Sequence, residues 1–342
     1  MDNIAIIGNA IVDNIKTINS YPKEGMLVNI NYISSSVGGC LCNAGINLKT
    51  LDKDNINVVA FSKVGNDFEG EFILNTLKKY QLDISNIIID KDNIQTGFTD
   101  VMTSSNGNRT FFHFKGTNKT FCINDINLDY FKNNPCLVHI GYLMLLDWFD
   151  LENKDNGTNM AQLLSILKSY GCKISIDLVS EDSPRFIRVV KPSLKYIDYL
   201  IINEVEASLL SKINVRDIDN NLIVENIKQI MILINKEFPN IKKIIIHSPE
   251  IGIILENNKF YILGSLILPK DFIKGSVGAG DAFAAGCLYG IANNFDNYKI
   301  LKIASCTAAN NLTSYDSISS AKSYEEIIKL DNLYKRLTFK ED

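Results

Sequence analysis

The sequence predicts an α/β fold, with a mostly parallel central sheet flanked by helices on both faces and a small β-sheet lid. Short apolar runs with the pattern of buried strands alternate with amphipathic helical segments along most of the 342 residues. This alternation is typical of a parallel sheet that helices cover on both sides. Two further strand-like stretches have no helical segment beside them, and we interpret these as a separate small sheet.

The strands predicted for the main sheet are apolar runs bounded by polar residues. They are Ile4–Gly8, Val58–Ser62, Leu137–Gly141, Lys173–Leu178, Tyr199–Ile202 and Ile244–His247. The clearest helical patterns between them are Phe68–Tyr80, Asn159–Tyr170 and Leu222–Phe238. Sheets of this kind bind ligands beyond the carboxyl ends of their strands, so functional residues are expected at that edge.

The predicted lid is built from Gly25–Val37 and Gly97–Lys115, and with its connections it covers approximately residues 14–37 and 95–120. In the second stretch, two apolar runs flank a turn-forming Ser-Asn-Gly-Asn segment, as in a β-hairpin. The chain shows no internal repeat, low-complexity segment or interdomain linker. We therefore expect a single domain over residues 1–342.

The composition excludes several classes of partner. Hydrophobic residues make up 46% of the chain and charged residues 22%, and the net charge of -4 includes no dense basic tract. A nucleic-acid partner is therefore not expected. No apolar segment is long enough to span a membrane, and the first residues lack the features of a signal peptide, so we expect a cytoplasmic protein with no membrane contact.

The seven cysteines are an odd number and mostly lie in apolar runs, which predicts reduced core thiols rather than a disulfide framework. Cys40 and Cys42 form a C-x-C pair. Because no second pair of cysteines or histidines lies nearby in the sequence, we interpret both as small helix residues and not as zinc ligands.

The strongest motif is Gly278-Ala279-Gly280-Asp281, which opens an apolar helical run ending near Ala292. Glycines at a helix start let backbone N–H groups approach an anion closely, so this segment predicts a phosphate or oxyanion cradle. Asp281 has two interpretations. It caps the helix, or it takes the proton of a bound hydroxyl as a general base.

A second polar cluster, Asn203-Glu204-Val205-Glu206, directly follows a predicted strand. Asn203 and Glu206 could organise the water shell of a Mg²⁺ ion, because Mg²⁺ usually keeps several waters and few protein ligands. The alternative is local. Asn203 would cap a helix and Glu206 would complete a capping box.

Residues suited to a polyol lie near the amino terminus. Gly38 and Gly39 precede a helical run in which Asn43 offers both a donor and an acceptor. Asp13 follows the first strand and could accept hydrogen bonds from two adjacent hydroxyl groups. Its alternative role is to cap a turn with Asn14.

Five segments, in this order, resemble the PfkB (ribokinase-like) family of carbohydrate kinases. They are Gly8–Asp13, Gly38–Ala44, Val64–Gly70, Asn203–Glu206 and Gly278–Gly286, so the resemblance covers nearly the whole chain. It implies an α/β body with a β-lid, ATP with Mg²⁺ as the phosphoryl donor, and a sugar hydroxyl as the acceptor. Apart from the resemblance, a small sheet with an apolar face needs a cover, so we expect the lid either to close over the sugar or to pair with the lid of a second copy, and a homodimer is the favoured cover.

The resemblance assigns roles to particular residues. Asp281 matches the catalytic base, and Gly278, Ala279 and Gly280 match the anion hole. Asn203 and Glu206 match the residues that organise phosphate and, through water, Mg²⁺. The sugar-contacting positions correspond to Asp13, Gly39 and Asn43, with Arg109 of the lid as a further candidate. Gly252 and His247 correspond to the turn beside the adenine pocket, with Asn310 as a neighbour on a later helix.

Three departures from the family pattern limit what it implies. Gly275 stands where the family has an Asp that helps to build a monovalent-cation site, so that cation is not implied here. His247 and Pro249 replace the usual Thr and Gly, which leaves the nucleotide preference open. The run Leu178–Glu181 lacks the Asn and Arg with which some members bind acidic keto-sugars.

Several residues have a plain structural interpretation. Arg109, His113 and Lys115 are separated by even steps on one predicted strand, so all three face either the sugar or water. His139, Tyr142 and Trp148 are interpreted as packing residues.

Two other functions remain open. A nucleoside kinase would use the same phosphate machinery with an aromatic clamp, for which the lid offers Phe98, Phe111, Phe112 and Phe114. A non-catalytic sugar-binding regulator would keep the fold without turnover, but the presence of Asp281 with both glycines argues against it. No G-x-G-x-x-G follows the first strand, which disfavours a dehydrogenase.

Overall fold

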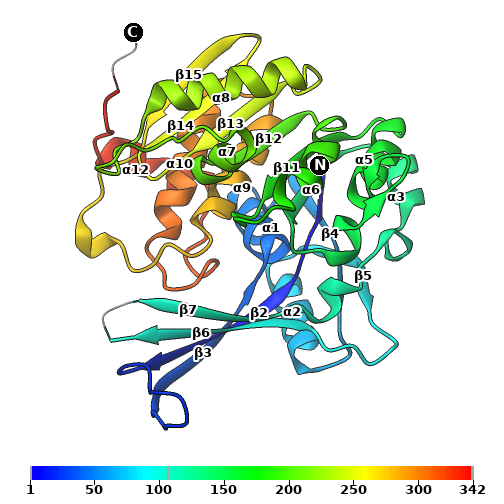
Figure 1. The fold of residues 1–342 in the computed structure, drawn as a ribbon, viewed down its shortest axis with the longest axis vertical. Helices are drawn as coiled ribbons and strands as arrows, with labels where there is room; N and C mark the ends of the chain where they lie inside the picture. The colour runs from blue at the N-terminus through cyan, green and yellow to red at the C-terminus, as the bar shows by residue number, and fades with distance from the viewer. Residues whose placement is uncertain (1, 106–107, 340–342) are drawn as a thin grey trace.

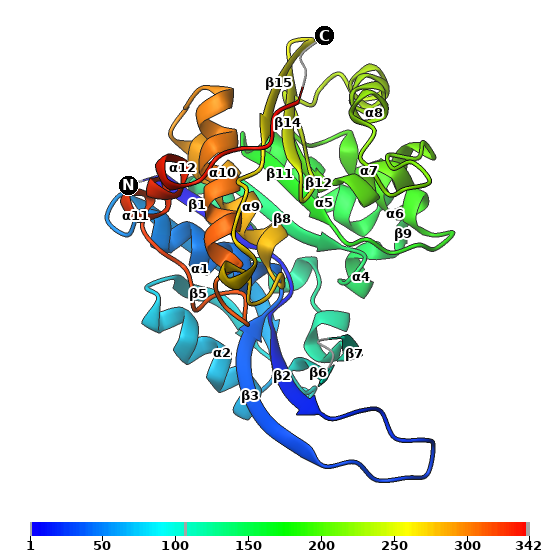
Figure 2. The same cartoon turned by 90° about the vertical axis from the view of Figure 1, so that its left-hand side faces the viewer.

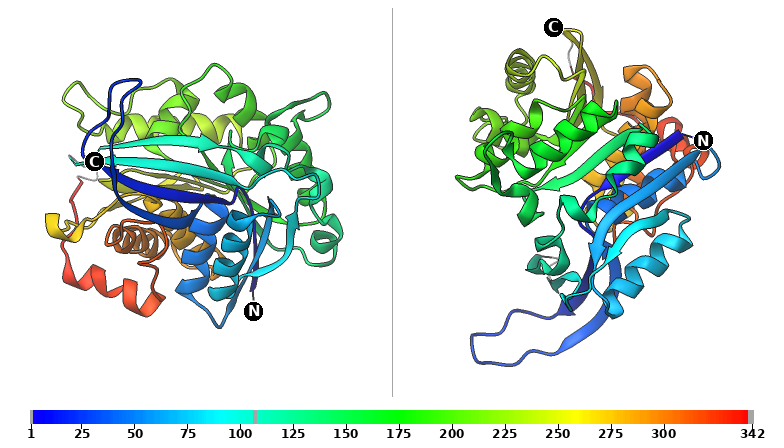
Figure 3. Two further views of the ribbon diagram at one scale, coloured as in Figure 1. Left: turned by 90° about the horizontal axis from the view of Figure 1, so that it is seen from below. Right: turned by 90° about the vertical axis from the view of Figure 1, so that its right-hand side faces the viewer.

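The fold consists of a body built on one large sheet and a smaller sheet that projects from it (Figure 1). The structure is a computed structural model that describes residues 2–105 and 108–339. Viewed from below, the strands of the small sheet lie across the body (Figure 3). The predicted fold class is confirmed.

The main sheet has nine strands in the order β15-β14-β13-β12-β11-β8-β1-β4-β5. Their bounds are β1 (Asp2–Ile7), β4 (Ile56–Val64), β5 (Asp83–Ile89), β8 (Leu137–Leu143), β11 (Lys173–Leu178), β12 (Tyr199–Asn203), β13 (Lys243–His247), β14 (Ile251–Glu256) and β15 (Lys259–Gly264). Neighbours from β5 to β13 pair in parallel, whereas β14 and β15 form an antiparallel edge. All six predicted strands are present, but β5, β14 and β15 were not predicted.

The order of the strands positions the site. From β1 the chain first adds β4 and β5 on one side and later adds β8, β11 and β12 on the other. The direction of winding therefore reverses between β1 and β8. A crevice at the carboxyl ends of the strands is expected at such a reversal.

Helices cover both faces of the main sheet. On one face lie α1 (Cys40–Leu51), α2 (Phe68–Lys79), α9 (Ala279–Ala292) and α10 (Asn297–Asn311). On the other lie α3 (Leu128–Asn133), α5 (Asn159–Ser169), α6 (Phe186–Leu194), α7 (Glu204–Ser211) and α8 (Val224–Glu237). Shorter elements are α4 (Asp147–Asp150), α11 (Tyr324–Ile327), α12 (Lys329–Leu333), the 3₁₀ turns at Gly116–Lys119, Ile123–Asp125 and Lys270–Phe272, and the ribbon of β9 (Glu152–Asn153) and β10 (Gly157–Thr158).

Each face of the sheet has its own hydrophobic core. In β1, Ile4 and Ile6 join the core beneath α1 and α9, while Ala5 and Ile7 join the core on the opposite face. Successive side chains of a strand point to opposite faces, so a strand buried on both sides is apolar throughout. The three predicted helices are all present, with ends that differ from the predictions by one or two residues.

The lid is a four-stranded sheet in the order β3-β2-β6-β7. Its strands are β2 (Ile11–Ile18), β3 (Ile30–Gly38), β6 (Gly97–Ser104) and β7 (Arg109–Phe114). β2 and β3 extend away from the body and are joined by the connection at 19–29 (Figure 2). The lid begins at Ile11, earlier than predicted, so Asp13 lies on a lid strand. The predicted turn at 105–108 includes residues 106 and 107, which lie outside the described residues.

Two expectations concern the chain as a whole. All seven cysteines are free thiols, as predicted. Within residues 2–105 and 108–339, no helix has the length and apolar character needed to cross a membrane.

Candidate active site

Asp281 is buried in the first turn of α9, near the end of β8, where Tyr142 contacts it. The N-cap of this helix is Gly278, whose φ of 77° is left-handed. A Cβ added to Gly278 would lie 2.4 Å from the Cβ of Ser317, so only glycine fits this turn. No side chain caps the helix. The interpretation of Asp281 as a helix cap is therefore wrong.

The Asp281 carboxylate is held by two side chains from distant parts of the sequence. Asn43 Nδ2 in α1 and the Tyr142 hydroxyl at the end of β8 donate to Oδ2 over 2.9 and 2.7 Å. The second oxygen, Oδ1, is buried and accepts no hydrogen bond within the described part of the chain. One oxygen thus fixes the carboxylate in place, and the other is buried without a hydrogen bond from these residues.

Burial gives Asp281 the character of a base. The residue is only 2% exposed, and burial raises the pKa of its carboxyl above the usual range. Hydrogen bonds from Asn43 and Tyr142 lower that pKa in part, and the nearby Cys40 thiol lowers it less. A carboxylate with a raised pKa is a better proton acceptor near neutral pH.

Asn43 is fixed at both ends of its amide. Its Oδ1 accepts a hydrogen bond of 2.6 Å from the Ser317 hydroxyl, while its Nδ2 donates to Asp281. The contact of Asn43 with a sugar stays a prediction. What the geometry adds is a positioning contact to Asp281 that the sequence did not indicate.

Asp13 faces the same region from the lid strand β2. A Cβ on Gly38 would lie 2.2 Å from Asp13 Oδ2, so Gly38 makes room for this carboxylate. Burial raises the pKa of Asp13 to about 6, a hydrogen bond with Thr99 lowers it, and the charge of Asp281 raises it further. The alternative of a turn cap with Asn14 is wrong, because both residues lie within a strand.

Gly39 lies between the lid strand β3 and helix α1. Its φ is 84°, and a Cβ there would lie 2.5 Å from the backbone oxygen of Asn9. The Asn9 side chain accepts a 3.0 Å hydrogen bond from the Cys40 backbone N–H. These contacts bring the start of α1 against the end of β1, which places Asn43 beside the crevice.

Two functional candidates escaped the sequence analysis. Tyr142 packs against the core beneath α1 and α9, as interpreted, but its hydroxyl also donates to Asp281, which the sequence did not indicate. Asp177 lies near the end of β11, and burial raises its pKa well above the usual range, with the charges of Glu206 and Asp281 adding to the effect. Their position at strand carboxyl ends is the signal that could have identified them. Trp148 does pack, edge-on against Phe149, as predicted.

Asn203 and Glu206 form the capping box that the sequence offered as an alternative. The Asn203 side chain accepts from the Glu206 backbone N–H over 2.9 Å, and Glu206 Oε2 accepts from the Asn203 N–H over 3.0 Å. Ser180 also donates to Glu206 over 2.9 Å. The local interpretation is confirmed, and the role of this pair toward Mg²⁺ stays a prediction.

His247 and Gly252 are paired across β13 and β14, as expected for one corner of a site. The His247 ring stacks on Phe283 at 4.6 Å, and a Cβ on Gly280 would lie 3.6 Å from its Cε1. His247 therefore lies beside the predicted anion hole. Asn310 is buried in α10 and donates to the backbone oxygen of Ser320, so its side chain is already engaged.

The lid face formed by Arg109, His113 and Lys115 points toward the body. Lys115 forms an ion pair of 2.5 Å with Asp147. A Cβ on Gly275 would lie 3.4 Å from Arg109 Nη2, which places this guanidinium beside the loop before Gly278. The interpretation that all three simply face water is wrong for Arg109 and Lys115. Arg109 therefore lies beside the loop before Gly278, whereas the sequence analysis grouped it with Asn43 as a candidate contact to the sugar.

The site is strongly acidic. Asp13, Asp177, Glu206 and Asp281 all have raised pKa values, with burial as the largest cause in each case. None of the four forms an ion pair with a basic side chain of the described residues. The residues present therefore fit a cation, or hydroxyl donors, better than they fit an anion at the sugar end.

Three features indicate a small-molecule kinase of the ribokinase fold. They are a parallel sheet whose winding reverses between β1 and β8, a buried carboxylate with one unpaired oxygen among the described residues, and a glycine-rich helix start. The chain belongs to the pfkB family of carbohydrate kinases, because residues 1–323 match the description "pfkB family carbohydrate kinase". It is a phosphotransferase that uses an alcohol group as acceptor.

Known proteins similar to this chain agree with that family. A ribokinase of Dictyostelium discoideum is 26% identical over 338 residues, which is 95% of this chain and 99% of the relative. A 5-dehydro-2-deoxygluconokinase of Geobacillus thermodenitrificans is 22% identical over 85% of this chain and 82% of the relative. The structure of Arabidopsis thaliana ribokinase complexed with ribose and ATP has a TM-score of 0.77 at 19% identity, covering 96% of this chain and 99% of that one.

Proposed function

We propose that this protein transfers the γ-phosphate of ATP to a hydroxyl group of a small carbohydrate, with Asp281 as the general base. The observation that carries the proposal is the buried Oδ1 of Asp281, which has no hydrogen-bond partner among residues 2–105 and 108–339 although Oδ2 has two. A buried polar atom without a partner is costly, so its site is suited to a ligand that supplies a hydrogen-bond donor. A sugar hydroxyl is such a donor, and the carboxylate would take its proton during transfer.

The backbone N–H groups of Gly278, Ala279 and Gly280 would stabilise the transferred phosphoryl group. They lie at the start of α9, where the first N–H groups of a helix lack intrahelical acceptors and the helix dipole favours an anion. Gly280 carries no side chain that would cover these amides. Phosphoryl transfer depends mainly on such positioning and electrostatic stabilisation.

Mg²⁺ would act through Glu206 and Asn203. Because the Glu206 carboxylate already accepts hydrogen bonds from Asn203 and Ser180, it would contact the ion through water rather than directly. When bound, Mg²⁺ neutralises charge on the phosphates of ATP.

Gly252 and His247 would line the adenine side of the site, with Asn310 behind them. The Arg109 guanidinium beside Gly275 supplies positive charge where relatives use a monovalent cation, so we propose no such cation here.

The pairing of the lid strands favours a sugar over a nucleoside. Asp13 pairs with Thr99, and Thr99 with His113, so these three share one face of the lid. Of the four aromatic candidates for a base clamp, Phe98, Phe112 and Phe114 lie on the opposite face, and Phe111 alone shares the face of Asp13. Asp13, with Gly39 and Asn43, would therefore meet a polyol.

A second copy of the chain is the partner we propose for the lid. The lid exposes apolar side chains that include Met26, Leu27, Tyr32, Ile33, Phe112 and Phe114, and the strand register places Ile33, Phe112 and Phe114 on one face of it. Apolar patches of this kind usually mark a contact surface. A dimer in solution that Phe112→Asp converts to monomer supports this interface, and a wild type that is monomeric contradicts it.

With ATP as donor and seven free thiols, we propose a cytoplasmic location.

The test of the proposed function is a coupled ADP-release screen with pentoses, hexoses, ketoses, sugar acids and nucleosides at saturating Mg·ATP. ADP release with a sugar supports the proposal, whereas release with nucleosides only would make the nucleoside kinase the better assignment. If calorimetry shows tight binding of a sugar but no candidate releases ADP, the protein is a sugar-binding regulator.

A further inference from the structure

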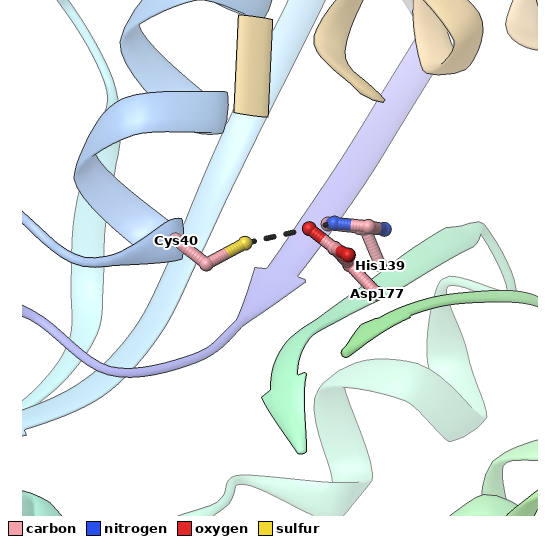
Figure 4. A group of neighbouring side chains, drawn as sticks. All are labelled: Cys40, His139 and Asp177. Atoms are coloured by element: carbon pink, nitrogen blue, oxygen red, sulfur yellow. Dashed lines mark hydrogen bonds between the residues drawn. The ribbon is translucent and has the colours of Figure 1, made fainter. Parts of the chain in front are cut away.

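Three side chains with metal-binding chemistry lie together: Cys40, His139 and Asp177 (Figure 4). The cluster adjoins Asp281, whose charge acts on both Cys40 and Asp177. Cys40 is the first residue of α1, His139 lies in β8 and Asp177 in β11. One potential ligand atom from each lies within 4.8 Å of the other two. Cys40 and His139 are fully buried and Asp177 is nearly so. The sequence did not indicate this cluster, because its members are far apart along the chain.

The distance between sulfur and nitrogen suits tetrahedral coordination. Cys40 Sγ lies 3.6 Å from His139 Nε2. Bond lengths of about 2.3 Å from Zn²⁺ to sulfur and about 2.0 Å to nitrogen, at a tetrahedral angle, place the two ligand atoms roughly 3.6 Å apart. The carboxylate oxygen needs a shift on the order of 1 Å to complete the third position.

The imidazole is oriented as a metal ligand usually is. His139 Nδ1 lies 3.2 Å from the Ser175 hydroxyl, and the two residues are paired on neighbouring strands. A neutral imidazole carries a single N–H and leaves the lone pair of its other nitrogen available for a metal. With Nδ1–H donating to Ser175, the lone pair of Nε2 faces Cys40. A hydrogen bond of this kind to the other ring nitrogen fixes the tautomer in most histidine–metal sites.

The surroundings favour a cation. The carboxylates of Asp281 and Asp177 are close enough to act electrostatically on the Cys40 thiol and on each other. The same carboxylates have no basic partner among the described residues, so a divalent ion would relieve their repulsion. A thiol and an imidazole select a thiophilic metal, whereas Mg²⁺ prefers oxygen ligands.

We propose that Cys40, His139 and Asp177 bind a thiophilic divalent cation, for which Zn²⁺ fits best, and that the bound ion inhibits phosphoryl transfer. Three protein ligands leave a fourth position open, and Asp281 is close to it. A cation there would hold the Asp281 carboxylate in its charged form and weaken it as a base. This inhibition rests on the proposed function, while the binding site stands without it.

Binding is tested with Co²⁺ on the full-length protein in the absence of nucleotide and sugar. Wild type should bind one Co²⁺ per chain with a near-ultraviolet sulfur-to-cobalt charge-transfer band, and Zn²⁺ should abolish that band. Cys40→Ser should lose the band, and Asp177→Asn should bind at least tenfold more weakly. Cys42→Ser is the matched control, because Cys42 is an equally buried thiol two residues further along α1.

Two results would overturn the site. One is a wild type with no charge-transfer band, and the other is a band that persists in Cys40→Ser but disappears in Cys42→Ser. If Cys40→Ser is misfolded by circular dichroism, Asp177→Asn decides the question through the affinity for Co²⁺.

Inhibition is tested by ADP release at fixed free Mg²⁺, with free Zn²⁺ set by a metal buffer so that chelation by ATP is equal in all samples. Each variant is compared with its own rate without Zn²⁺. The rates of wild type and Cys42→Ser should fall at least tenfold with Zn²⁺, and a chelator should restore both rates, whereas the rate of Cys40→Ser should not fall.

Zinc that binds but leaves the rate unchanged refutes the inhibition. If no acceptor supports ADP release, the proposed function fails, and the cobalt spectrum still decides the binding site.

Discussion

Glu206 and Asp281 are each the third residue of a helix, α7 and α9, yet their carboxylates have different partners. The Glu206 carboxylate accepts a hydrogen bond from the backbone N–H of Asn203, three residues earlier at the start of the same helix. Asp281 binds Asn43 and Tyr142, which are 238 and 139 positions away in the sequence. The same residue position thus serves a local structural purpose in one helix and a long-range one in the other.

The residue at the N-cap explains the difference. Asn203 has an extended backbone and a side chain that accepts from the third residue, so the reciprocal capping box can form. Gly278 is left-handed and has no side chain to take part. A glycine at the N-cap therefore frees the acidic side chain of the first turn for partners elsewhere, and in α9 these partners are in the active-site crevice.

The largest effect is expected for Asp281→Asn. An amide cannot accept the hydroxyl proton, so kcat should fall by about 10² to 10⁴, which is roughly 3 to 5 kcal/mol of barrier. The measurement is kcat on the best substrate, with calorimetric binding of sugar and nucleotide as the control, since both should persist. A variant that retains more than about a tenth of the wild-type kcat would exclude a general-base role.

The next effect concerns Asp13, the acidic residue that the lid contributes. Asp13→Ala should raise KM for the sugar by the equivalent of about 1.5 to 3 kcal/mol, because a charged hydrogen-bond acceptor is lost. An unchanged KM would contradict the contact. For wild type, kcat/KM should decrease as the pH falls through about 6, where Asp13 becomes protonated.

The raised pKa of Asp13 also predicts how the free energy of unfolding depends on pH. Its folded-state pKa of about 6 exceeds the ordinary 3.8, so its contribution to stability is fully present below about pH 4 and is lost as the pH rises through 6. Asp13→Asn should remove this part of the pH dependence. Denaturant unfolding of both proteins between pH 4 and 7 measures it, and parallel pH profiles would show that Asp13 is not buried as described.

Tyr142→Phe separates the positioning of Asp281 from its chemistry. Loss of the hydroxyl removes a hydrogen bond that lowers the pKa of Asp281, so the acidic limb of the kcat profile should move to higher pH. A hydrogen bond to a charged group is worth about 1.5 to 3 kcal/mol, which corresponds to roughly one to two pH units. A reduced kcat with an unshifted limb would indicate that Tyr142 contacts the substrate instead.

The smallest effect is expected at the local cap. Asn203→Ala should cost about 1 kcal/mol of unfolding free energy, because the amide of the first turn loses its acceptor. Glu206→Gln preserves the capping box and should leave stability nearly unchanged, but it should raise the Mg²⁺ concentration needed for half-maximal rate. If that concentration stays the same in Glu206→Gln, Glu206 acts as a cap alone.

The fold and the motifs near helix starts were predictable from sequence, because both depend on local patterns. Apolar strands, glycine turns and the Asn203 cap are readable within a few residues. The partners of Asp281 could not be predicted from sequence, since Tyr142 is brought close to it only by the pairing of β8 with β1. Cys40 and His139 illustrate the same limit, because no spacing in the sequence relates a helix start to the middle of a strand.

The turn that carries Tyr142 has a consequence for how this protein would respond to selection. Tyr142 and Met144 have φ values of 58° and 88°, a left-handed backbone that costs an ordinary residue roughly 1 to 2 kcal/mol. Glycine at position 142 would relieve this cost and also remove the hydroxyl that holds Asp281. The hydrogen bond to Asp281 and the packing of the ring together outweigh that cost, so selection for stability and selection for catalysis both favour Tyr142.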